Sequence, residues 1–200
     1  MDAWIWIVIA VVVVLVIIAV VAAAMSKSRR RHHLQERFGS EYDRTVEHSD
    51  DRRSGEKILR EREKRRSQFD VTPLSGADAD RYREEWLSVQ GGFVDRPAEA
   101  VQQADSLVVR MMRDSGYPVD DFDHRVDDIS VDHPDVAQHY RDAHAIALAQ
   151  LNGTADTEQL RQAVTSYREL VDALLREGGS TQAGMSEDRS SQGSRDDHAG

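Results

Sequence analysis

The side chains best suited to chemistry lie between positions 120 and 144, where aspartates and histidines are concentrated. Carboxylate and imidazole groups are common ligands of divalent cations. Four of them are close enough in sequence to form a loose metal site: Asp123, His124, Asp127 and Asp128. The segment lacks the central glycine and the glutamate at position twelve of an EF-hand loop. The alternative that we favour is a solvated acidic connector over residues 119–132, because runs of like charge usually face water.

A second group in and beside this segment is a candidate interaction surface, formed by Ser130, Asp132, His133, Tyr140, Arg141 and His144. His144 could act with Asp132 as a catalytic or ligand-supporting pair if the fold brings them together. A simpler interpretation is that Asp132 caps the following helix and that His144 lies between helices. The sequence contains no cysteine, nucleophile elbow, phosphate-binding glycine loop or zinc-ligand spacing. It therefore favours a protein that is not an enzyme and indicates no cofactor.

The N-terminus contains a long apolar block. Ala3 to Met25 carries no polar or charged side chain and would span roughly 35 Å as a helix. Residues 1–25 are therefore predicted to hold a transmembrane helix. The basic residues that follow are Lys27, Arg29, Arg30 and Arg31. By the positive-inside rule they predict a single-pass cell-membrane protein with its N-terminus outside and its C-terminal domain cytoplasmic. The same basic side chains would bind the anionic inner leaflet of the lipid bilayer.

The charge changes sign along the rest of the chain. Residues 26–66 carry 14 Lys/Arg against 9 Asp/Glu, whereas residues 67–177 carry 10 against 22, a net charge of −12. Residues 26–68 thus form a basic helical collar, which could either lie on lipid or pack on the acidic domain. Its arginines alternate with glutamates, so the pattern does not favour nucleic acid as a partner.

Apolar residues at helical spacing predict an all-α fold. Four helices are expected in an acidic bundle over residues 69–177: one capped by Ser75, one from Pro97 to Gly116, one from Pro134 to Leu151, and one capped by Thr154 or Thr157. Such stripes must be buried against one another, so a compact bundle of about four helices is predicted. Residues 178–200 are poor in apolar side chains and are predicted to be a disordered tail.

Several short segments resemble an uncharacterised family of small bacterial single-pass membrane-anchored proteins. The most distinctive is Ser130-Val131-Asp132-His133-Pro134, and the others include Arg37-Phe38-Gly39 and Gly116-Tyr117-Pro118. The likeness covers residues 37–175. Because the family is of unknown function, the resemblance implies a membrane location and brings no activity, cofactor or site residue.

The function expected from these observations is that of a membrane-anchored cytoplasmic helical interaction or scaffold protein with a protein partner. One alternative is a metal-dependent enzyme or regulator that uses the Asp- and His-rich segment 120–144. A second is cleavage of the N-terminal block as a signal peptide, followed by export.

Overall fold

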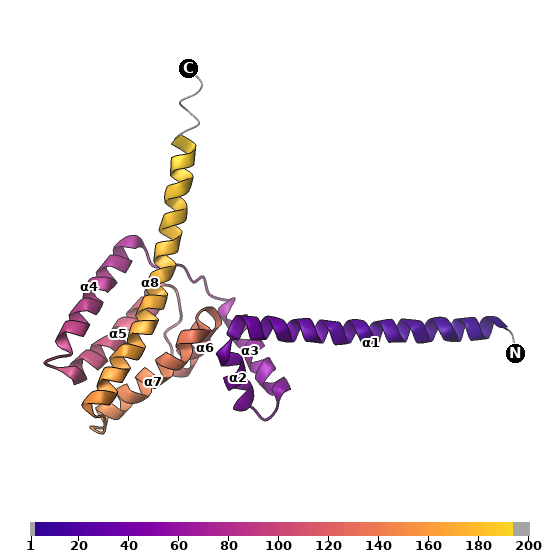
Figure 1. Cartoon of the computed structure of the whole chain (residues 1–200), viewed down its shortest axis with the longest axis horizontal. Helices are drawn as coiled ribbons and strands as arrows, with labels where there is room; N and C mark the ends of the chain where they lie inside the picture. Colours follow the sequence, from indigo (N-terminus) through magenta and orange to yellow (C-terminus); the bar gives the residue numbers. More distant parts are fainter. Residues whose placement is uncertain (1–2, 194–200) are drawn as a thin grey trace, which may run out of the picture. The chain divides into compact units, whose positions relative to one another are not determined.

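The computed structural model describes residues 3–193, and over this range the chain is all-helical (Figure 1). Side chains at positions 3, 5–11, 20, 23, 24, 27 and 177–193 lie outside the description. Eight helices occur within the described residues: α1 (Ala3–Phe38), α2 (Ser40–Glu47), α3 (Arg52–Arg66), α4 (Gly76–Gly92), α5 (Pro97–Asp114), α6 (Phe122–Asp132), α7 (Pro134–Leu151) and α8 (Thr157–Gly193). The predicted all-α class is confirmed.

The N-terminal apolar block does not form a membrane span in the part of the chain whose side chains are described. Among those residues no helix has both the length and the apolar character needed to cross a bilayer. This finding contradicts the predicted transmembrane helix and the single-pass membrane location. The other side chains of the block lie largely outside the described ones.

The chain divides into two units, Met1–Arg60 and Glu61–Gly200, with the boundary inside α3. In the first unit Phe38 and Tyr42, four residues apart in the sequence, are both buried. The Tyr42 hydroxyl donates a hydrogen bond to Glu56 Oε1 at 3.1 Å. Gly39, at φ 47°, separates α1 from α2 and is the N-cap residue of α2, which has no side-chain cap.

The second unit contains a helical bundle in which α4, α5, α7 and α8 pack together and α6 packs on α7 (Figure 1). Its core is built from the predicted stripes. On α8 the buried residues include Leu160, Val164, Tyr167, Val171 and Leu174, and on α5 they include Ala100, Ala104, Leu107, Val108, Met111 and Met112. The helical periodicity of the sequence therefore identified the buried faces correctly.

The number of helices differs from the expectation. Residues 69–177 contribute to five helices, not about four, because the supposed acidic connector forms α6. Asp121 caps this helix by accepting a hydrogen bond from the His124 backbone amide at 2.9 Å.

The predicted disordered tail also differs: α8 continues through residue 193, and residues 194–200 lie outside the described part.

The predicted helix boundaries hold at α4 and α5. Ser75 caps α4 by accepting a hydrogen bond from the Asp78 amide at 3.1 Å, and Pro97 begins α5. The cap of α8 is different, since Asp156 replaces the expected threonines. Its carboxylate accepts from the Gln159 amide while the Gln159 side chain accepts from the Asp156 amide, both at 2.8 Å. This is a reciprocal capping box.

Tyr82 of α4 gives a prediction for alkaline pH. Its hydroxyl donates to Asp114 Oδ2 at 2.6 Å, and burial, this hydrogen bond and the carboxylate charge raise the pKa of Tyr82 to about 12. A raised tyrosine pKa stabilises the fold below pH 10, and this contribution is lost as the pH rises from 10 to about 12.

We therefore expect the Tyr82→Phe variant to cost about 1 kcal/mol at neutral pH. The difference in unfolding free energy between the two proteins should then shrink as the pH rises through that window. Urea unfolding at a series of pH values measures it. If the difference were the same at every pH, the assigned shift at Tyr82 would be incorrect.

Candidate functional site

A highly charged contact within the second unit joins the last turns of α3 to α6. Arg62, Arg65 and Arg66 are spaced i, i+3 and i+4, so they share one face of α3. We call their contact with α6 the Arg–Asp seam, formed by Arg62, Arg65, Arg66, Asp120, Asp127, Asp128 and Asp132.

Each arginine of the Arg–Asp seam reaches a different carboxylate. Arg62 Nη2 lies 2.7 Å from Asp127 Oδ1. The Nε of Arg65 donates to both oxygens of Asp128, at 3.0 and 3.2 Å. Arg66 donates to Asp132, which also accepts a hydrogen bond from the Tyr117 hydroxyl at 2.7 Å. The seam is thus a set of charge-assisted hydrogen bonds with defined partners.

The central pair of the seam is asymmetrically buried. The Asp128 side chain is 0% exposed, whereas that of Arg65 is 31% exposed. Burial raises the pKa of Asp128, and the neighbouring Arg65 only partly offsets this effect. The hydrogen bond to Asp128 in turn raises the pKa of Arg65. The buried carboxylate therefore depends on its guanidinium partner.

The seam changes the interpretation of the acidic segment. The sequence left two alternatives for the collar, contact with lipid or packing on the acidic domain. Its residues Arg62, Arg65 and Arg66 pack on acidic residues. Arg29, Arg30 and Arg31 are exposed in the first unit, and the Lys27 side chain lies outside the description.

The four weak metal candidates do not come together as a ligand set. Arginines bind Asp127 and Asp128, while His124 Nδ1 lies 2.6 Å from Asp121 and the Asp123 side chain is exposed. Among the described residues no group of three or more His, Asp or Glu side chains has an arrangement that could hold a metal ion. The geometry supports ion pairing for Asp127 and Asp128 and helix capping for the neighbouring Asp121.

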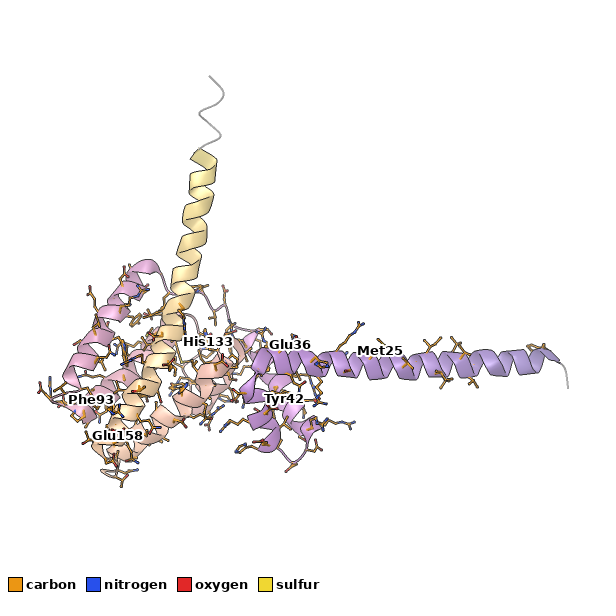
Figure 2. All side chains as sticks on the ribbon, viewed as in Figure 1. Met25, Glu36, Tyr42, Phe93, His133 and Glu158 are labelled. Atoms are coloured by element: carbon orange, nitrogen blue, oxygen red, sulfur yellow. The ribbon has the colours of Figure 1, made fainter. Side chains whose placement is uncertain are left out.

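Of the six residues predicted as an interaction surface, two are buried and four are partly exposed. Ser130 and Tyr140 are fully buried, and Ser130 donates to the Asp127 carbonyl at 2.7 Å. Asp132 serves the seam and does not cap α7, whose N-cap residue is His133. Figure 2 shows His133 where α6 meets α7. Asp132, His133, Arg141 and His144 are the four that are partly exposed.

His144 pairs with a residue that sequence analysis did not identify. Its Nδ1 lies 3.5 Å from Asp105 Oδ1 on α5, so Asp105 takes the place proposed for Asp132. The Tyr167 hydroxyl donates to the same oxygen of Asp105 at 2.7 Å. The Phe122 ring stacks on the imidazole with centroids 3.7 Å apart. Residues from α5, α6, α7 and α8 therefore meet in one polar cluster within the bundle.

The electrostatics of this cluster follow from burial and from one carboxylate. Burial by itself would raise the pKa of Asp105, but His144 and the Tyr167 hydroxyl outweigh it and hold that pKa below its usual value. Burial and the Asp105 charge raise the pKa of Tyr167. Tyr140 accepts a hydrogen bond from Arg125 Nε at 3.0 Å, yet burial still raises its pKa. The hydroxyls of Tyr140 and Tyr167 are therefore hydrogen-bonded, whereas the buried Nδ1 of His144 lies 3.5 Å from Asp105 Oδ1 and makes no hydrogen bond within the described residues.

The residues missed from sequence are those whose partners are distant along the chain. Asp105 directly follows the buried Ala104 in the apolar stripe of α5. A carboxylate at such a position was the sequence feature that could have indicated a polar contact with other helices. Arg62 and Arg65 had the charge and spacing of a binding face. Nothing local, however, indicated that their partners lie on α6.

The second unit also has an open groove between α4 and α8, two helices that pack on each other. We call it the α4–α8 groove. Its volume is about 660 Å³, and it is lined by Arg83, Trp86, Leu87, Asp172, Leu175 and Arg176. Trp86 and Leu175 are buried at 6% and 8% exposure, whereas Leu87 is 66% exposed. An apolar hollow with an exposed leucine beside it is suited to receiving apolar side chains.

Comparison with known proteins adds no functional assignment. No family model, curated protein or solved structure is significantly similar to this chain. The resemblance described above therefore stays an expectation, and the function must be argued from the geometry.

Proposed function

We propose that this protein is a helical protein-interaction module that holds a partner in the α4–α8 groove. The observation that carries the proposal is the exposed Leu87 beside the apolar hollow over Trp86 and Leu175. Burial of one leucine side chain contributes about 1.5–3 kcal/mol, which is enough to make it an anchor of an interface. The rim of the groove is charged, as the rims of protein interfaces are.

The internal polar groups support this role over catalysis. In the Arg–Asp seam the carboxylates of Asp127 and Asp128 are bound by guanidinium groups, so they are committed to structure. The Asp105–His144 pair lies within the bundle and is not part of the groove. Binding through the groove uses none of these groups, so a rigid scaffold and an accessible surface coexist in one domain.

The proposal is tested by a photo-crosslinking amino acid placed at position 87 of the full chain in cells. We expect a discrete adduct with a defined protein, because a partner that fills the groove must contact this side chain. The matched control is position 151 on α7, where Leu151 is 68% exposed. Leu87→Asp should weaken binding of that protein at least about tenfold, while Leu151→Asp should not. Equal adducts at both positions, or none at position 87, would contradict the proposal.

A further inference from the structure

We infer that the partner in the α4–α8 groove is a second copy of this chain, related to the first by a two-fold axis. This inference rests on the proposed function, since it names the occupant of the same groove. In a two-fold interface the same patch of both subunits must be complementary to itself. The α4–α8 groove meets this condition both in shape and in charge.

The shape argument concerns Leu87 and the hollow beside it. Leu87 projects from α4 and is 66% exposed, while Trp86 and Leu175 lie at the bottom of the groove with 6% and 8% exposure. One patch therefore carries both a protruding apolar side chain and an apolar recess. Two copies facing each other would each place Leu87 in the recess of the other. Both exposed leucines are then removed from water by one contact.

The charge argument concerns the α8 side of the groove. Asp172 and Arg176 are four residues apart, so they lie one above the other on the same face of α8. If two copies of α8 run antiparallel across an axis midway between these positions, Asp172 of each copy faces Arg176 of the other. Both charges on each copy are then paired across the axis. A partner of uniform charge would place a like charge opposite either Asp172 or Arg176.

The α4 side of the rim is compatible with this arrangement. Arg83 Nη1 lies 2.5 Å from Asp80 Oδ1. The side chain of Arg83 is 47% exposed and that of Asp80 is 78% exposed. Exposed pairs of this kind contribute little to stability, so Arg83 can turn toward an incoming subunit at small cost. The rim therefore offers both charge signs within one patch, as a self-complementary surface requires.

The first test is the mass of the purified full chain in solution, measured by light scattering over a range of concentrations. We expect a dimer that dissociates on dilution. Leu87→Asp should raise the dissociation constant at least about tenfold, because two carboxylates would enter apolar recesses. Leu151→Asp is the control and should leave the dissociation constant unchanged. A monomer at every concentration, or a dimer that Leu87→Asp does not weaken, would overturn the inference.

The second test reverses the charges on α8. Asp172→Arg alone and Arg176→Asp alone should each weaken the dimer, since each places like charges opposite one another. The double variant Asp172→Arg/Arg176→Asp restores opposite signs across the axis, so it should dimerise within about threefold of the original protein. Circular dichroism checks that each variant keeps its helices. A double variant no tighter than the single variants would rule out the pairing across the axis.

These outcomes separate the inference from the proposed function. If the purified chain is monomeric while position 87 still crosslinks to a different protein, the second copy is excluded and the interaction module stands. If position 87 forms no adduct with itself or with another protein, both proposals fail.

Discussion

The Arg65→Ala variant is expected to be about 3–5 kcal/mol less stable than the original protein at neutral pH. The Asp128 carboxylate is 0% exposed, and Arg65 donates to both of its oxygens. Removal of the guanidinium leaves a buried charge without this partner, which is among the most destabilising single changes in a protein. Chemical denaturation of the full chain measures the effect.

The pH dependence identifies the cause of this loss. Burial already raises the pKa of Asp128 above its ordinary value, and removal of Arg65 takes away the group that opposes this rise. An acid whose folded-state pKa is raised destabilises the fold when it is ionised. The penalty therefore decreases as the pH falls through that raised pKa toward the ordinary value of 3.8. The difference between Arg65→Ala and the original protein should accordingly be smallest in acid.

Two further variants complete this experiment. Arg65→Leu combined with Asp128→Leu replaces the pair by apolar side chains and should recover most of the lost stability. Arg161→Ala is the matched control, since Arg161 pairs with Glu158 and both side chains are largely exposed, at 64% and 70%. It should cost less than about 1 kcal/mol. If Arg65→Ala cost no more than Arg161→Ala, Asp128 would not depend on Arg65.

The second large effect is expected at Gly116, where alanine should cost about 3 kcal/mol. Gly116 has a φ of +90°, a conformation that costs a residue with a side chain about 1–3 kcal/mol. An added Cβ would also lie 2.5 Å from the Asp70 carbonyl oxygen. That segment cannot move freely, because the neighbouring Thr72 amide donates to the Ser115 carbonyl at 2.9 Å. Overpacking of this kind adds a further penalty.

Gly153 provides the control for the steric part of this prediction. Its φ of +69° is also positive, but an added Cβ would meet no atom within 4 Å. Gly153→Ala should therefore cost only about 1–2 kcal/mol, the penalty of the backbone conformation itself. Thermal or urea unfolding of both variants gives the comparison. If the two variants lost the same unfolding free energy, the close contact with the Asp70 carbonyl would contribute nothing to the cost at Gly116.

The bundle helices were predictable because their signals are local. Tyr82, Trp86 and Val89 repeat at helical spacing and are all buried on α4. Gly116 was expected to end its helix, and its positive φ and the hydrogen bond from the Tyr117 amide to the Met112 carbonyl at 2.9 Å confirm this. Side-chain periodicity and capping depend on residues within one or two turns, so they can be recognised in the sequence alone.

Helix α6 and the N-terminal block show where local signals failed. Clustered aspartates predicted a solvated connector, but arginines of α3 bind them and allow a helix. Apolar composition predicted a membrane span, which the described residues do not support. For α6 the acidic pattern was read correctly, but the conclusion depended on the arginines of α3 that pack against it.

The amino-acid sequence by itself determined the all-α class, the buried faces of the bundle helices and several helix ends, since these follow from hydrophobic spacing and backbone chemistry over a few residues. Only the tertiary structure decided that Arg65 lies against Asp128, that His144 pairs with Asp105, and that Leu87 stands beside an open recess. Each of these relations joins residues on different helices. Its energy depends on distance and burial in three dimensions, and neither quantity is encoded by separation along the chain.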